Sequence, residues 1–223
     1  MIDRNGFWRV MGAYGAHIWP AQAVFYLAGV LVVGWLYLRP GPLQNRLAKL
    51  YLALAFGWNG IAFYLVLARD LAGESVGNVV LGALFLVVAV LLGVDLFRRR
   101  MVFALPTGWR RTVTLALTLL VFCYPLFGLA LGHPALIVLG TFPCPTVALG
   151  LVLLATALPL VDEVVYVLLL IFAIPFTPFV QIARYGVYED AILFGTGVYS
   201  LVLLLLAGRP SFTDGQHAQA EAL

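Results

Sequence analysis

Three residues that commonly bind metal ions or react as nucleophiles are His17, His133 and Cys144. Imidazole nitrogen and thiolate sulfur are ligands that many transition metals accept. Cys144 stands between two prolines at an expected helix start, where the helix dipole favours the thiolate form of a cysteine. The three residues therefore form a candidate metal, haem or redox site. The alternative for each is an ordinary role in packing, in a turn or at an interface.

A second group consists of polar and aromatic residues inside or beside apolar segments. Polar groups in hydrocarbon must find partners, so such positions are candidates for a ligand site. Asn59 also fits an interhelical hydrogen bond, because the neighbouring Gly60 allows helices to approach closely. Trp19 also fits an interface anchor. The candidate substrate-binding residues are His17, Trp19, Gln22, Trp58, Asn59, Tyr124, His133, Thr146 and Gln181.

Recognised catalytic motifs are absent from the sequence. It has no Walker loop, no Rossmann glycine pattern, and neither the GxSxG nor the HExxH motif. Enzymatic activity is therefore less expected than binding or transport, and we predict no catalytic residue. Cys123 is expected roughly 12 Å below the end of its helix, whereas Cys144 is expected at the surface. A disulfide between the two is not expected.

The overall composition determines which elements must position these residues. Of 223 residues, 63% are hydrophobic and 10% are charged, and the mean hydropathy is +1.03. A soluble domain carries roughly a quarter charged residues. This composition excludes a soluble globular enzyme, a disordered chain and a nucleic-acid-binding protein. It predicts a protein whose surface faces the lipid bilayer.

The apolar stretches predict an all-α bundle of about seven transmembrane helices, because roughly 20 apolar residues cross a bilayer as a helix. Residues 158–163 are interpreted as a tight turn, since Asp162 and Glu163 would be costly in hydrocarbon. One tilted helix through them would instead leave six spans. The seven predicted spans are about 17–38, 47–68, 76–97, 112–131, 145–160, 164–183 and 190–207.

Three regions of the chain are expected to behave differently. Residues 1–16 are predicted to form an interfacial amphipathic segment, residues 17–208 the transmembrane domain, and residues 209–223 a disordered polar tail. Lysine and arginine favour the cytoplasmic side. With seven spans, nine of the 13 positive residues lie on one side. The N-terminus is therefore expected outside and the C-terminus in the cytoplasm.

Several local patterns occur together in a characteristic order. They are residues 18–22 (IWPAQ), 58–60 (WNG), 124–128 (YPLFG), 132–134 (GHP) and 141–146 (TFPCPT). Through them the chain resembles the bacterial domain-of-unknown-function family 6064, which consists of small multi-pass membrane proteins. The resemblance implies a location in the bacterial inner membrane. It supplies no activity. The acidic pair Asp162 and Glu163 departs from the expected pattern.

These observations lead to three functional hypotheses. The first is a permease or channel for a small molecule or ion, with His17, Gln22, Asn59, His133 and Gln181 lining an outer vestibule. The second is an outward-facing sensor or binding module that uses Cys144 with His133 and His17. The third is a scaffold subunit whose polar residues only bind helices together. The lipid bilayer is the expected partner, self-association is left open, and no cofactor is identified.

Overall fold

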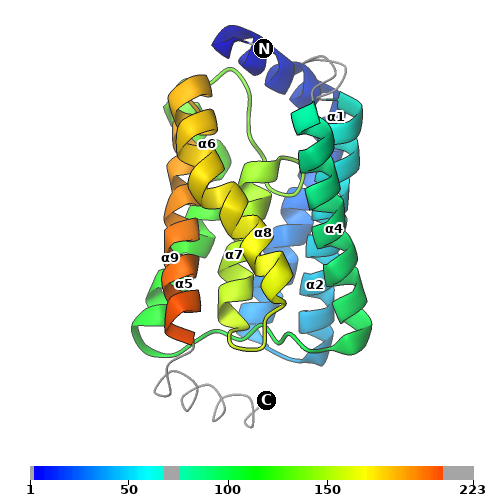
Figure 1. Cartoon of the computed structure of the whole chain (residues 1–223), viewed down its shortest axis with the longest axis vertical. Helices are drawn as coiled ribbons and strands as arrows, with labels where there is room; N and C mark the ends of the chain where they lie inside the picture. Colours follow the sequence, from blue (N-terminus) through cyan, green and yellow to red (C-terminus); the bar gives the residue numbers. More distant parts are fainter. Residues whose placement is uncertain (1–2, 68–75, 208–223) are drawn as a thin grey trace.

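The computed structural model describes residues 3–67 and 76–207, which form a bundle of helices along one long axis (Figure 1). No strand element occurs within these residues. In chain order the elements are α1 (Arg4–Leu38), α2 (Pro42–Trp58), η1 (Asn59–Leu67), α4 (Val76–Arg98), α5 (Gly108–Phe122), α6 (Tyr124–Ala130), α7 (Pro143–Thr156), α8 (Glu163–Ile171), η2 (Phe172–Tyr185), η3 (Tyr188–Asp190) and α9 (Ala191–Ala207).

Several elements join into longer helices. The π-helix η1 continues α2, η2 is a π-helix that continues α8, and the 3₁₀ turn η3 leads into α9. Five helices are long and apolar enough to cross a membrane, and the pair α5 and α6, bent by 58°, would make a sixth. The all-helical prediction is confirmed for the described residues. The count of seven spanning helices is not.

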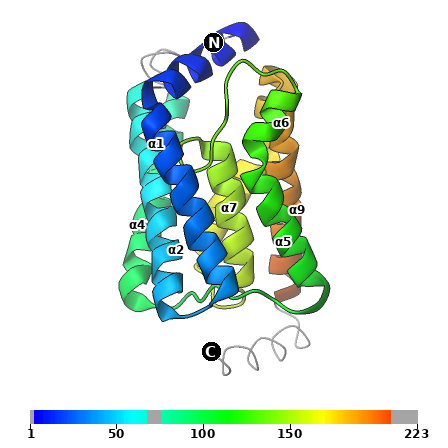
Figure 2. The ribbon, with the colours of Figure 1, turned by 180° about the vertical axis from the view of Figure 1, so that it is seen from behind.

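The predicted number of spanning helices differs from the number found because of the predicted span 145–160. The helix found there, α7, has 14 residues and is about 21 Å long, which is shorter than the roughly 30 Å hydrocarbon core. All 14 residues are buried, and α7 packs against α2, α5, α8, α9 and η2 (Figures 1 and 2). The apolar sequence of α7 therefore reflects burial inside the protein.

The outer helices expose their apolar side chains instead. Leu54 of α2 is 57% exposed, Val90 of α4 is 63% exposed and Leu205 of α9 is 70% exposed. Such a surface is costly in water, because transfer of apolar area out of water contributes about 25 cal/mol per Å². The outer helices have the surface expected of helices that face lipid.

The segment predicted as a separate interfacial element is part of α1. Asp3 caps this helix by accepting a hydrogen bond from the backbone of Gly6 (2.8 Å). The first turns of α1 lie across the upper end of the bundle, and the rest of the helix descends along its side (Figure 2). Trp8, Met11 and Tyr14 of these turns are buried. The predicted tail 209–223 lies outside the described residues.

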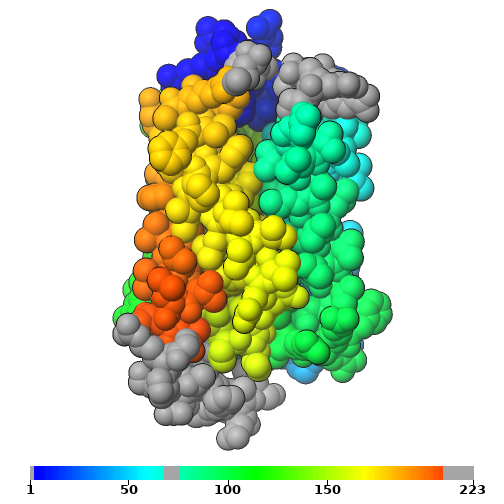
Figure 3. Space-filling model, viewed as in Figure 1, coloured from blue at the N-terminus to red at the C-terminus, as the bar shows by residue number. Residues whose placement is uncertain are grey.

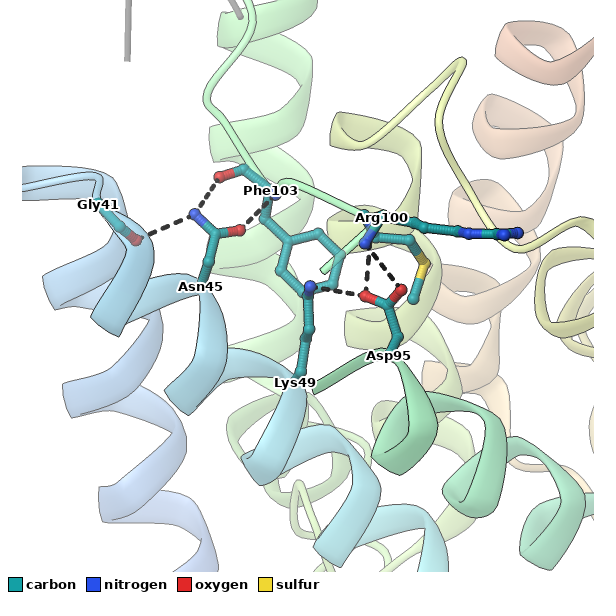
Figure 4. A network of polar contacts seen from close by, with 7 residues as sticks. Gly41, Asn45, Lys49, Asp95, Arg100 and Phe103 are labelled. Atoms are coloured by element: carbon teal, nitrogen blue, oxygen red, sulfur yellow. Dashed lines mark hydrogen bonds and ion pairs between the residues drawn. The ribbon is translucent and has the colours of Figure 1, made fainter. Parts of the chain in front are cut away.

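The lower end of the bundle is closed by the segment between α4 and α5. The ammonium of Lys49 lies 2.6 Å from the carboxylate of Asp95, and both side chains are buried. The Asp95 carboxylate also accepts hydrogen bonds from the backbone of Arg100 and Met101 (Figure 4). Side chains of α2 and α4 thus fix the path of this segment.

The predicted turn between α7 and α8 is confirmed. Helix α7 ends at Thr156 and α8 begins at Glu163. Asp162 is the N-cap of α8, and its carboxylate accepts a hydrogen bond from the backbone of Val165 (3.1 Å). Such a cap contributes about 1 kcal/mol. The acidic pair is placed at a helix start at the lower end of the bundle, outside the apolar core.

Candidate functional site

The segment between α6 and α7 re-enters the bundle from its upper end (Figure 2). It runs downward from the end of α6 at Ala130 to Pro143, where α7 begins. Gly140 has a φ of +87°, a conformation that favours glycine. A Cβ atom there would also lie 2.7 Å from the Cβ of Phe25. The segment therefore requires glycine at this position to pass α1.

Several side chains hold the re-entrant segment by its backbone. The Asn59 amide donates hydrogen bonds to the carbonyls of Ala55 (2.8 Å) and Gly140 (3.0 Å). The Thr146 hydroxyl accepts from the backbone N–H of Gly140 (3.1 Å) and donates to the carbonyl of Phe142 (2.6 Å). Both residues, predicted to bind substrate, therefore make structural contacts that place the start of α7.

A tyrosine and a tryptophan hold the next residue of the segment. The Tyr14 hydroxyl donates to the carbonyl of Thr141 (3.0 Å), and the indole N–H of Trp58 donates to the Tyr14 hydroxyl (2.9 Å). These bonds link α1 and α2 to the segment. Trp58, another predicted substrate-binding residue, therefore contacts the segment only indirectly, through the Tyr14 hydroxyl. No local sequence pattern marks Tyr14, because its partner lies 127 residues away.

The close helix approach expected at Gly60 is present. A Cβ atom on Gly60 would lie 2.9 Å from Leu86 and 3.1 Å from the carbonyl of Gly82, so η1 and α4 meet through two glycines. Asn59 itself does not bond to this neighbouring helix. Its long-range partners lie in the re-entrant segment and in α7.

We expect Asn59→Leu to lower the free energy of unfolding by about 2 kcal/mol, because the buried carbonyl of Gly140 loses its donor. Unfolding by a denaturing detergent, followed by tryptophan fluorescence, measures this effect. The control is Thr196→Val, which removes a hydroxyl bonded only within its own helix. Equal stability of the two variants would contradict the structural role of Asn59.

A cavity of about 240 Å³ lies at the start of α7, below the first turns of α1. Figure 3 shows the surface receding between the upper parts of η2 and α4. Most of its lining is apolar or aromatic and includes Phe63, Tyr64 and Phe142. Asn78, Cys144 and Gln181 are polar residues of the same lining. The cavity combines an apolar chamber with a small polar area.

Gln181, a residue of the cavity lining, carries an acceptor without a partner. The residue is 7% exposed, and its amide nitrogen lies 3.7 Å from the sulfur of Cys144. Its amide oxygen, Oε1, is buried and has no hydrogen-bond partner. An unpaired buried acceptor costs about 1–3 kcal/mol. A ligand with a hydrogen-bond donor would supply the missing partner.

Behind Cys144 lies a buried acidic pair at the start of α9. The Tyr124 hydroxyl, on α6, donates to the carboxylate of Asp190. The ring nitrogen Nδ1 of His133 lies 2.9 Å from the carboxylate of Glu189, and the Trp8 ring lies 4.2 Å from the His133 ring. These contacts join α6, the re-entrant segment, η3 and α1.

Sequence reasoning missed the importance of this acidic pair. In the sequence, Glu189 and Asp190 fit acidic residues at a helix N-terminus. They are buried because α6 and the re-entrant segment pack over them. Tyr124 and His133, predicted to bind substrate, lie beside this acidic pair. Their partners are the two carboxylates rather than the other candidates.

The predicted metal-binding set is not assembled. Within residues 3–67 and 76–207, no group of three or more His, Cys, Asp or Glu residues could hold a metal ion. His17 is exposed, and its ring nitrogen Nδ1 contacts the carbonyl of Ala13 within its own helix. Cys123 and Cys144 are both free thiols. The structure therefore offers no support for a site combining His17, His133 and Cys144.

Two predicted substrate-binding residues lie away from the cavity. Trp19 is 66% exposed on α1, as expected of a residue at a lipid or interfacial surface. Gln22 is half-buried, and its amide nitrogen has no hydrogen-bond partner in the described structure. Neither is among the described residues lining the cavity. Of the predicted substrate-binding residues, Gln181 is the one that lines it.

The fold and site define a class: apolar helical bundles with membrane-length outer helices and a re-entrant segment that ends in a short central helix. Within that class, a family model described as "Family of unknown function (DUF6064)" matches residues 4–213. The chain belongs to this family, as its sequence patterns indicated. Neither the curated proteins nor the solved structures contain a significant match.

Proposed function

We propose that the protein spans the bacterial inner membrane and that the upper cavity is the recognition site of a small-solute permease. The observation that carries this proposal is the unpartnered, buried Oε1 of Gln181, a residue that lines the cavity at the start of a short central helix. Helices that begin inside a bundle are typical of transporter binding sites. The re-entrant segment and α7 together make the seventh crossing that α7 alone is too short to make.

Charge and chain direction support an outside N-terminus for this membrane protein. The described chain starts at the upper end of the bundle, and α9 ends at the lower end (Figure 1). The positively charged residues 46, 49 and 98–100 lie on elements that meet at the lower end. Because such residues favour the cytoplasm, the cavity would open toward the outer half of the membrane.

The chemistry of the cavity specifies a class of solute. Its walls are mostly apolar, and Gln181 offers a hydrogen-bond acceptor. The preferred solute is therefore uncharged and compact, with an alkyl part and a hydroxyl or amide donor. Inorganic ions are poor candidates, because none of the described lining residues is charged and a buried ion needs pairing.

Cys144 provides a test of binding, because this residue lines the cavity. The Cys123→Ser protein is reconstituted into liposomes and labelled with N-ethylmaleimide in the presence of short-chain amides, diols or amino alcohols. A bound solute is expected to slow labelling of Cys144. Uptake of each protecting solute is then measured against protein-free vesicles. If no solute of the panel protects Cys144 or enters faster, the proposed permease function is contradicted.

One observation favours a second candidate, a ligand-binding sensor. All 14 residues of α7 are buried, so the centre of the bundle below the cavity is filled with protein. A sensor binds its ligand but does not transport it across the membrane. Protection of Cys144 without accelerated uptake would support this candidate over the permease.

A further inference from the structure

A second cavity, of about 320 Å³, lies at the lower end of the bundle between the start of α2 and the segment after α4. Its described lining includes Arg46, Lys49 and Arg99 and no carboxylate. Lys49 is neutralised by Asp95. The guanidinium groups of Arg46 and Arg99 have no ion-pair partner within residues 3–67 and 76–207. Among the described residues, this cavity therefore carries two positive charges that no carboxylate compensates.

The backbone that carries Arg99 is held firmly. Its N–H donates to the carbonyl of Asp95 (2.8 Å), and the next two N–H groups donate to the Asp95 carboxylate. Two residues further on, the backbone of Phe103 exchanges hydrogen bonds with the side chain of Asn45 (Figure 4). Arg99 has a φ of +54°, a conformation that non-glycine residues rarely adopt. These bonds fix the backbone of Arg99, which lines the cavity together with Arg46.

The helix face above Arg46 is apolar and exposed. Leu43, Arg46, Leu50 and Leu54 recur at helical spacing, so they share one face of α2. The three leucines are 53%, 41% and 57% exposed, respectively. An acyl chain can lie along Leu50 and Leu54 while its headgroup reaches Arg46. A free anion would use only the charged end of this surface.

We propose that this cavity binds the phosphate of an anionic phospholipid between Arg46 and Arg99, with an acyl chain along Leu50 and Leu54. Guanidinium groups match phosphate oxygens in geometry and charge. A zwitterionic lipid presents the same phosphate together with its own ammonium, which two uncompensated arginines disfavour. The site is separate from the upper cavity and does not depend on its function.

The test compares phosphatidylglycerol with phosphatidylcholine of identical acyl chains, using delipidated protein in a neutral detergent. Binding is measured by native mass spectrometry and by the shift in melting temperature. We expect tighter binding of phosphatidylglycerol. Arg46→Gln or Arg99→Gln should each weaken it about fivefold, and the double variant about 25-fold, from the attraction of each cation to an anionic lipid.

Arg111→Gln is the matched control, because Arg111 is exposed on α5 and does not line this cavity. It should leave phosphatidylglycerol binding unchanged. Melting temperatures without added lipid show whether each variant is folded. Equal binding of the two lipids would overturn the proposal. So would a loss of phosphatidylglycerol binding in Arg111→Gln as large as the loss in Arg46→Gln or Arg99→Gln. If inorganic phosphate at equal concentration displaced the lipid fully, the site would be an anion site and the lipid assignment would be wrong.

Discussion

Replacement of Asp95 by alanine is expected to lower the free energy of unfolding by about 3–5 kcal/mol, because it leaves a buried ammonium without its partner. The Lys49 and Asp95 side chains are 3% and 9% exposed, and the charged atoms lie 2.6 Å apart. The same carboxylate holds the backbone of Arg100 and Met101. Its loss therefore also releases the segment that closes the lower end of the bundle.

A second variant separates the ion pair from the backbone contacts. Lys49→Met with Asp95→Leu removes both charges, and a buried ion pair can often be replaced by apolar residues with little loss. We expect the double variant to recover at least half of the stability lost in Asp95→Ala. The unrecovered part measures the two backbone N–H groups left without an acceptor.

Denaturing-detergent titration of the purified protein gives the free energy of unfolding for each variant. Glu163→Ala is the control carboxylate, because Glu163 is exposed and surface substitutions usually change stability by less than about 0.5 kcal/mol. If Asp95→Ala cost no more than Glu163→Ala, the buried pair would have no role in stability. If the double variant were less stable than Asp95→Ala, the attraction between the two charges would outweigh the cost of their desolvation.

The helix positions could largely be predicted from the sequence. The predicted span 76–97 corresponds to α4 (Val76–Arg98), and the predicted span 190–207 corresponds to η3 with α9. Long apolar runs that end at charged residues, glycine or proline carry this information. Hydropathy reports transfer out of water, however, and does not distinguish lipid from the interior of a protein. Hydropathy alone therefore could not predict the central position of α7.

The polar site could be predicted only in part. The sequence indicates Asn59, Thr146 and Gln181, because polar residues at their expected depth need partners, and all three are buried. It indicates His17 and Trp19 on the same ground, but these two residues are exposed. Helix α1 is apolar on most of its circumference, so the sequence does not indicate which face turns inward. Asp190 is buried through contacts with α6 that no local pattern encodes.

Gln181→Met is expected to weaken binding of a donor-bearing solute in the upper cavity roughly 100-fold. Methionine has a similar shape but offers no comparable acceptor, so the donor of the bound solute would be buried without a partner. Such a group costs up to about 3 kcal/mol, which corresponds to this loss of affinity. The concentration dependence of Cys144 protection in the Cys123→Ser protein measures the affinity.

The stability of the same variant distinguishes a ligand site from a structural contact. In the protein without ligand, Oε1 of Gln181 is buried and unpaired, so its removal should leave the free energy of unfolding unchanged or raise it. A scaffold role predicts the opposite, a loss of stability with no effect on Cys144 protection. Gln44→Met, at the lower end of α2, is the matched amide control and should change neither measurement. Unchanged affinity in Gln181→Met would contradict the assigned recognition role, because no other described lining residue is known to carry an unpaired acceptor there.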